Sequence, residues 1–464
     1  MKLLSRFFTL AALVALATFT SCSDDDDDNN NPEQESNTIV DLAVATQELG
    51  TLVDALTAAN LAGTLQGAGP FTVFAPTDDA FAAFLEANNF SSLDDVPNDV
   101  LTAVLLNHVI AGNNTAATLP EGYISSLSTA GADGRALSMF IDKTNGVRIN
   151  GVATVTAADN MADNGVVHIV DAVIGLPTVV THALANPNLT ELVGALTADG
   201  NTTFTNLLSD ASATYTVFAP VNAAFTAFDN PDGNDINTIL SYHVIAGDAA
   251  FSDELASGYV SAFATNMDGD NLSQYINVSD NGVSINGMSN VAAADIVAVN
   301  GAIHAVDAVI DLPKVTTFAV ADPTFAPLVT ALTSGTPDTD FVTVLNGAGP
   351  FTVFAPTADA FQALLDSNDD WNEVTDIDAT LLTSVLNHHV VSGNVRSGDL
   401  TDGINPPTLE GDNIIINLPG TGDNIADVTD GSGATDIGII AVDVQANNGV
   451  IHVLNKVMIP DTTN

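Results

Sequence analysis

The sequence repeats itself three times, and this repetition constrains the fold more than any other feature. The box Thr-Val-Phe-Ala-Pro begins at Thr72 and recurs at Thr216 and Thr352. The copies are therefore about 140 residues apart, the size of a typical domain. The aromatic and proline positions of the box are Phe74 and Pro76, Phe218 and Pro220, and Phe354 and Pro356. The spacing predicts three tandem copies of one domain, in which a recurring element belongs to the architecture.

A histidine stands at two equivalent places in each copy. The first set is His108, His243 and His389, and the second set, after an Asn-Gly pair, is His168, His304 and His452. An Asn-Gly pair ahead of an apolar run is typical of a tight turn that enters a strand. One histidine per element, flanked by aliphatic residues, is more often a buried, hydrogen-bonded side chain than a ligand or a catalyst. We therefore expect these six histidines to be structural.

Each copy opens with a helical pattern and ends with strand patterns. Leu49, Leu52, Val53 and Leu56 follow the spacing i, i+3, i+4, i+7, which predicts one apolar helical face. Thr77, directly after the Phe-Ala-Pro turn, is placed to cap a second helix. Residues 147–151 alternate between apolar and polar, as a half-buried strand does. Because helices come early and strands late, the expected fold class is α+β rather than alternating α/β.

The third copy departs from the other two near its end. The distance from Asn417 to His452 is nearly twice that from Asn150 to His168. The additional residues, roughly Gly420 to Gly438, are rich in Gly and Asp, and we expect them to form a long surface loop.

The N-terminus has the pattern of a secretion signal. Lys2 and Arg6 precede the apolar run Phe7 to Phe19, which is too short to cross a bilayer comfortably and is typical of a signal peptide. Small residues then lead to Cys22, in a pattern that resembles the cleavage box of bacterial lipoproteins. We expect residues 1–21 to be removed and Cys22 to be lipidated; an ordinary secretion signal with a chance cysteine is the alternative.

An acidic run follows at once. Asp24 to Asp28 come directly after the cysteine and resemble the signal by which Bacteroidetes lipoproteins reach the outside of the outer membrane. We expect residues 22–37 to form an acidic, disordered tether.

Charge and cysteine content exclude several classes of function. The chain has 8 Lys and Arg against 57 Asp and Glu, a net charge of −49. Such a chain repels phosphate backbones, so nucleic acid is not an expected partner, and anionic membrane surfaces are disfavoured beyond the lipid anchor. With Cys22 alone, an internal disulfide and a cysteine-rich metal site are both excluded.

Catalytic and metal-binding patterns are weak. The sequence has no Gly-x-Ser-x-Gly elbow, phosphate loop or dinucleotide fingerprint. The loop from Asp229 to Asp235 looks like a calcium loop, but its twelfth position is Leu240 where a Glu is required. A second acidic cluster is Asn266, Asp268 and Asp270, for which loose cation screening is the simpler interpretation. We expect no enzyme activity, no cofactor and no specific metal.

Two further histidines lie outside the six. His182 stands where the other copies have Leu42 and Phe318, and in this apolar position we expect it to be packed. His388 is adjacent to His389; helical neighbours point about 100° apart, so the pair is not suited to hold one metal ion.

Together, the three motifs resemble those of the fasciclin domain in order and spacing. Thr72 to Thr77 looks like its first signature, and Gly165 to Ile174 like its second. The third copy departs from the second signature, with Asn455 and Lys456 in place of an Asp-Ala pair. The central Tyr-His pair of the family is complete only at Tyr242 and His243. The resemblance implies three tandem fasciclin-like domains, 38–177, 178–313 and 314–460, each a helical N-terminal half packed on a β-rich wedge or sandwich.

The resemblance also implies a class of function. Fasciclin domains are usually extracellular adhesion or matrix-binding modules without a cofactor. The expectation is thus a non-catalytic adhesion protein, lipid-anchored on the outer membrane and binding an extracellular protein or polysaccharide. The alternative is a surface lipoprotein that captures a glycan or nutrient, which would need a concave, aromatic-lined pocket. One Trp, Trp371, and five Tyr in the chain count against that alternative.

Overall fold

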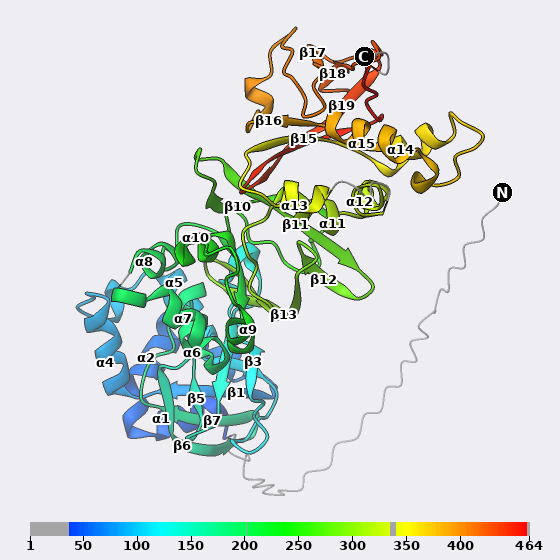
Figure 1. Ribbon diagram of the computed structural model, residues 1–464. Coiled ribbons are helices and arrows are strands. Elements are labelled where there is room, and N and C mark those ends of the chain that lie inside the picture. Colours follow the sequence, from blue (N-terminus) through cyan, green and yellow to red (C-terminus); the bar gives the residue numbers. More distant parts are fainter. Residues whose placement is uncertain (1–36, 201, 335–339, 462–464) are drawn as a thin grey trace, which may run out of the picture.

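The computed structural model describes residues 37–200, 202–334 and 340–461. Three sheets with flanking helices follow one another along the chain, with the first and third at opposite ends and the second between them (Figure 1). We refer to them as the first, second and third domains. The predicted signal peptide, the lipidation site Cys22 and nearly all of the tether lie outside the described residues.

The first domain runs from α1 to β7. Its helices are α1 (Ile39–Ala45), α2 (Gly50–Ala58), α3 (Ala62–Leu65), α4 (Asp78–Ala87) and α5 (Asn98–Leu106), with 3-10 turns η1 (Gln47–Leu49), η2 (Leu93–Asp95) and η3 (Ala132–Gly134). Its strands are β1 (Phe71–Pro76), β2 (Val109–Ala111), β3 (Gly122–Ser125), β4 (Ser138–Asp142), β5 (Arg148–Ile149), β6 (Ala153–Ala162) and β7 (Gly165–Val170). The sheet order is β2-β1-β7-β6-β5-β4-β3.

The second domain repeats this order. Its helices are α6 (Val179–Ala185), α7 (Thr190–Leu196), α8 (Thr203–Leu208), α9 (Asn222–Ala227) and α10 (Ile236–Tyr242), with turns η4 (Pro187–Leu189) and η5 (Ala198–Gly200). Its strands are β8 (Tyr215–Pro220), β9 (Val244–Ala246), β10 (Gly258–Thr265), β11 (Asn271–Ser279), β12 (Gly282–Ile285), β13 (Ser289–Ala298) and β14 (Gly301–Val306), in the order β10-β11-β12-β13-β14-β8-β9.

The third domain has a shorter sheet. Its helices are α11 (Val315–Ala321), α12 (Ala326–Thr333), α13 (Phe341–Leu345), α14 (Ala358–Leu365) and α15 (Ala379–His388), with turns η6 (Pro323–Phe325), η7 (Val374–Asp376) and η8 (Ser397–Asp399). Its strands are β15 (Phe351–Pro356), β16 (Val390–Ser392), β17 (Ile415–Asn417), β18 (Ala426–Thr429), β19 (Ile437–Ala446) and β20 (Gly449–Leu454), in the order β16-β15-β20-β19-β18-β17.

The two signature motifs form neighbouring strands at the centre of each sheet. β1 pairs in parallel with β7, so that Phe74 lies opposite His168, and the other two domains repeat this register. A proline ends each motif strand, since it cannot continue the ladder. Thr77 then accepts a hydrogen bond from the Ala80 N–H at 3.2 Å and caps α4, as the sequence predicts.

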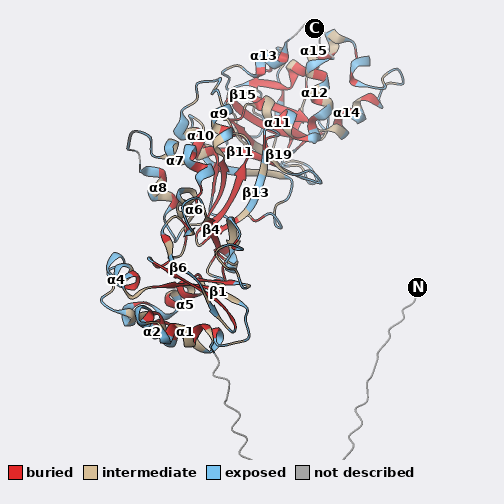
Figure 2. Cartoon of the chain, turned by 90° about the horizontal axis from the view of Figure 1, so that it is seen from below, coloured by how far each residue is buried: buried red, intermediate tan, exposed pale blue. Residues whose placement is uncertain are grey.

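The core of each domain has two apolar layers, one on either face of the sheet. In the first domain the larger layer joins the helices to the sheet, with Leu49, Leu52 and Phe81 buried in it. The smaller layer lies on the other face around Phe74. Buried residues accordingly follow the strands, whereas the helices expose one side (Figure 2). Early helices packed on a β-rich half give the expected α+β class.

The prediction of a long surface loop at Gly420–Gly438 is wrong. The segment contributes β18, which pairs with β17 and β19 and extends the sheet. Ala426 and Val428 are fully buried in the apolar layer around Phe354. Asp427, between these two small apolar residues, is buried as well. The surrounding Gly and Asp conceal this buried strand in the composition.

Among the described residues, no single helix is long and apolar enough to cross a membrane. The segments Val315–Ala321 and Pro323–Thr333 satisfy the length and composition only when taken together, and they are bent by 95°.

Candidate functional site: histidine latches and domain junctions

The first histidine of each domain bridges two segments, since one ring nitrogen donates a hydrogen bond and the other accepts one. We refer to His108, His243 and His389 as the latch histidines. Their Nδ1 atoms lie 2.7 to 2.8 Å from the carbonyl oxygens of Val104, Ile239 and Val385. Their Nε2 atoms accept from the N–H groups of Ile174, Ile310 and Met458 at 2.8 to 2.9 Å. A carbonyl only accepts, so each neutral ring carries its hydrogen on Nδ1.

The latch ties a helix end to the chain that leaves the last strand. Burial lowers the pKa of each latch histidine from 6.5 to about 4, opposed by the bond to the carbonyl. Protonation would place a hydrogen on Nε2 against an N–H group and would break the bond. In the first two domains the latched segment continues into the next domain, at Val179 and Val315.

The second histidine of each domain carries its hydrogen on the other nitrogen. The Nε2 atoms of His168, His304 and His452 donate to the carbonyls of Asn114, Ala250 and Val395 at 2.9 Å. Their rings lie 5.7, 5.8 and 5.5 Å from those of Phe74, Phe218 and Phe354. Both signature motifs thus meet in one buried contact. In all six histidines, one ring nitrogen donates its hydrogen to a backbone carbonyl. Loss of that hydrogen, as in acid–base catalysis, would break the bond.

The residue before the latch histidine differs in each domain. Asn107 donates to the carbonyl of Gly175 at 2.9 Å. Tyr242 donates to the carbonyl of Ser273 at 2.5 Å and accepts from Asn286 at 2.7 Å. All three residues at this position, including His388, are fully buried.

His388 is the centre of a cluster in the third domain. Possible ligand atoms of His388, Glu410 and Asp412 lie within 4.8 Å of one another. However, His388 Nε2 accepts from the Gly431 N–H at 3.1 Å. The ring hydrogen of the neutral form is therefore on Nδ1, 3.8 Å from Glu410 Oε2. A metal ion would need the Nδ1 lone pair, so the geometry fits a hydrogen-bonded hub that fixes the additional segment to α15.

Apolar cavities lie between the helices and the sheet at the same place in each domain. Their volumes are ≈ 10, 40 and 30 Å³ in the first, second and third domains. Ligand pockets measure about 300–1,000 Å³, so these spaces are too small for a sugar. An open hollow at the surface is lined by Thr46, Gln47, Glu48, Thr77, Asp78 and Asp79, without an aromatic side chain.

The first and second domains meet at a junction built on Tyr123, which we refer to as junction 1–2. The ring of Tyr123, on β3, lies edge-on to the ring of His182, on α6, with 5.4 Å between centroids. Ser138 Oγ accepts from the Val297 N–H at 2.9 Å. At the rim, Arg135 binds Asp253 at 2.7 Å and Glu254 at 3.1 Å. His182 is buried, as expected, but it packs against the preceding domain, which the sequence did not indicate.

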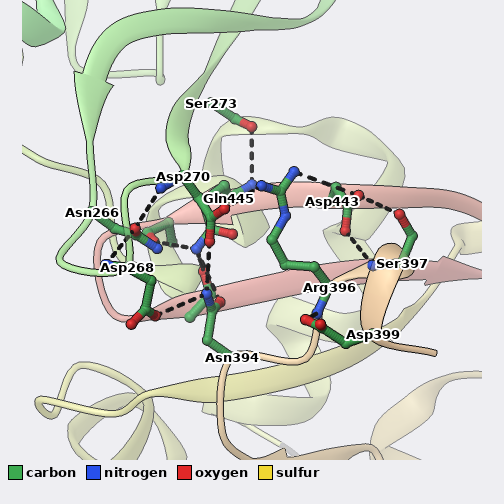
Figure 3. A network of polar contacts seen from close by, with 12 residues as sticks. Asn266, Asp268, Asp270, Ser273, Asn394, Arg396, Ser397, Asp399, Asp443 and Gln445 are labelled. Carbon is green, nitrogen blue, oxygen red and sulfur yellow. Dashed lines mark hydrogen bonds and ion pairs between the residues drawn. The ribbon is translucent and has the colours of Figure 1, made fainter.

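The second and third domains meet in the same way at junction 2–3. The ring of Tyr259, on β10, lies edge-on to Phe318 of α11 at 5.5 Å. Its hydroxyl donates to Asp322 at 3.0 Å. Ser273 Oγ accepts from the Gln445 N–H at 2.9 Å (Figure 3). Tyr123 and Tyr259 both follow a glycine in the sequence, and this repeated Gly-Tyr pair is the signal that could have identified the junctions.

The second calcium candidate lies at the rim of junction 2–3. Asp270 accepts from Arg396 at 2.5 Å, and Arg396 also lies 3.5 Å from Asp443. Asn394 Nδ2 donates to both Asp268 and Asp270 at 3.3 Å (Figure 3). These carboxylates therefore face a guanidinium and an amide across the junction.

The first calcium candidate also has internal partners. Asp232 pairs with Lys314 of the third domain at 2.8 Å, and Asp235 accepts from the Thr238 N–H at 3.0 Å and caps α10. Only six Lys and Arg follow Cys22 in the sequence, and three of them, Arg135, Lys314 and Arg396, pair with a carboxylate of a neighbouring domain.

The family model of the Fasciclin domain matches residues 47–177, 187–313 and 324–460. The chain belongs to the fasciclin family. Protein sll1483 of Synechocystis is 43% identical over 161 residues, which are 35% of this fasciclin protein and 86% of that relative.

Two mammalian relatives match most of the chain. Transforming growth factor-beta-induced protein ig-h3 of Sus scrofa is 26% identical over 85% of this chain, and Periostin of Homo sapiens is 24% identical over 93%. The chain spans about half the length of these two relatives, 54% and 48%. A solved domain pair from the insect cell adhesion molecule Fasciclin I covers 59% of this chain and 95% of its own, with 19% identity and a TM-score of 0.34.

Proposed function

We propose that this fasciclin protein is a non-catalytic, lipid-anchored protein of the outer membrane surface that presents three docked domains to extracellular matrix or to neighbouring cells. The observation that carries the proposal is the use of the repeated polar side chains. The six motif histidines bind backbone groups inside their own domains. Their role is to close each domain, which leaves binding to the exterior.

Adhesion through several weak contacts suits this architecture. Three linked domains raise the avidity of contacts that would be weak singly. A strongly acidic exterior favours a cationic or neutral partner over nucleic acid or an anionic membrane. The partner class is an extracellular protein or polysaccharide. Capture of a glycan in a pocket is not supported, because the apolar cavities are too small and the open hollow has no aromatic lining.

The anchor is tested with the full-length chain and the variant Cys22→Ser. Growth with an alkyne-tagged palmitate should label the full-length chain only, and external protease should remove the protein from intact cells. Label that persists in Cys22→Ser contradicts the lipid anchor; protection from protease contradicts surface exposure.

Adhesion is tested by the retention of cells under flow on surfaces coated with matrix protein or polysaccharide. Cells with the native chain should be retained, whereas cells that secrete Cys22→Ser without anchorage should detach. Equal detachment of both contradicts an adhesive role. Tight, specific binding of one sugar on a glycan array would support capture instead.

A further inference from the structure

His182 lies at a position whose burial depends on the neighbouring domain. The equivalent residues are Phe318 at junction 2–3 and Leu42 in the first domain. His182 and Phe318 are both 0% exposed, whereas Leu42, which no described domain precedes, is only half-buried. When the first domain leaves the second, the ring of His182 therefore becomes accessible to water.

In the docked state, the surroundings of the His182 ring accommodate only its neutral form. His182 Nε2 donates to the carbonyl of Val297 at 3.1 Å. Among the residues that the structure describes, Nδ1 has no hydrogen-bond partner, and Tyr123 covers the ring edge-on. A second hydrogen on Nδ1 would thus be buried without an acceptor, together with a positive charge, and such a group is costly to bury.

Titratable groups on the elements that pack against α6 include Asp295, His304 and Glu191. Asp295, on β13, accepts from the Ser252 N–H, His304, on β14, binds the carbonyl of Ala250, and Glu191 lies on α7. Tyr123 stays protonated, because burial raises its pKa. The rim residues Arg135, Asp253 and Glu254 pair with one another.

We propose that junction 1–2 is an acid-sensitive joint, in which protonation of His182 undocks the first domain from the second while both stay folded. Junction 2–3 has Phe318 at this position and stays docked. Both junctions have the tyrosine and the serine, and their rim charges differ, but only junction 1–2 has a histidine under the tyrosine ring.

The direction follows from the shift of the His182 pKa. Burial lowers it from 6.5 to about 4, opposed by the Val297 carbonyl. A group with a lowered pKa in the docked state favours docking above pH 6.5, and this contribution is lost as the pH falls towards 4. At pH 5 the docking equilibrium shifts towards the open form by roughly 30-fold, from the difference between the two pKa values.

The test uses the mature chain with Cys22→Ser and pairs of spin labels. Ala83, Ala227 and Ala363 occupy equivalent positions on α4, α9 and α14 and are all exposed. Labels at Ala83→Cys and Ala227→Cys report on junction 1–2, and labels at Ala227→Cys and Ala363→Cys report on junction 2–3. Distance distributions are recorded at pH 7.5 and pH 5, with circular dichroism on the same samples.

At pH 5 the distribution across junction 1–2 should broaden and that across junction 2–3 should stay narrow, with unchanged circular dichroism. His182→Phe should keep junction 1–2 narrow, and Phe318→His should transfer the broadening to junction 2–3. A narrow distribution across junction 1–2 at pH 5, equal broadening in His182→Phe, or loss of secondary structure before any broadening would overturn the proposal.

Discussion

The two junctions share one plan and differ in their charges. Both place a tyrosine ring against the first helix of the next domain and a serine hydroxyl against a strand N–H. At junction 1–2 the cation, Arg135, is on the preceding domain. Between the second and third domains the cations, Arg396 and Lys314, are on the following domain. The second domain therefore contributes carboxylates at both of its ends, Asp253 with Glu254, and Asp270.

This reversal shows how similar domains can specify their order. The aromatic and backbone contacts are nearly interchangeable, so they do not distinguish one neighbour from another. The rim charges do, because the first domain docked directly on the third would bring Arg135 towards Arg396. Repulsion between these like charges disfavours the wrong pairing of domains, and it does so without strengthening the correct pairing.

The largest expected effect comes from breaking the bonds of the latch histidines, which all three domains have in common. The latch histidines have pKa values lowered from 6.5 to about 4, so their contribution to stability is complete above pH 6.5 and is lost as the pH falls towards 4. The loss amounts to about 3 kcal/mol for each histidine by pH 4. Urea unfolding and amide hydrogen exchange at Ile174, Ile310 and Met458 should both report it. A free energy of unfolding that stays constant from pH 7 to pH 4 contradicts the latch.

The next effect distinguishes the two tyrosines. Tyr259→Ala should weaken docking at junction 2–3 by about 2–3 kcal/mol, because it removes a packed ring and one of the tyrosine hydroxyl groups bonded to Asp322. Tyr123→Ala should cost less, about 1–2 kcal/mol, since the partners of its hydroxyl, the His182 carbonyl at 3.3 Å and the Asn186 side chain, are uncharged. Spin-label distances across each junction measure the opening.

Tyr259→Phe is the matched control, because it keeps the ring and removes only the hydrogen bond. Its cost should be about 1 kcal/mol. Equal effects of Tyr259→Phe and Tyr259→Ala would show that the hydroxyl, and not the ring, holds the junction.

The smallest effect concerns the rim charges. Arg396→Gln should weaken docking at junction 2–3 by about 1 kcal/mol at low salt. The difference from the native chain should disappear near 1 M salt, where screening acts over about 3 Å. Lys143→Gln is the control, because Lys143 binds the carbonyls of Ala117 and Leu119 within its own domain. A loss of docking that is independent of salt would show that Arg396 acts by packing.

The repeat, the α+β class and the helical faces could be predicted because they depend on local patterns. Leu52 and Leu56 are buried in α2 as their spacing indicates, and Thr77 caps α4. The junctions could not be predicted in this way, since Ser138 and Val297 meet from domains far apart in the sequence. β18 was missed because two small apolar residues, Ala426 and Val428, stand among Gly and Asp. The structural role of the six histidines remains a prediction, which the pH dependence of unfolding described above tests for the latch histidines.

The central claim is that the three domains form one docked array through two equivalent junctions. Spin-label distances at pH 7.5 between Ala83→Cys and Ala227→Cys, and between Ala227→Cys and Ala363→Cys, test it most directly. The account predicts one narrow distribution for each pair. Broad distributions, as expected for domains on flexible linkers, would contradict it.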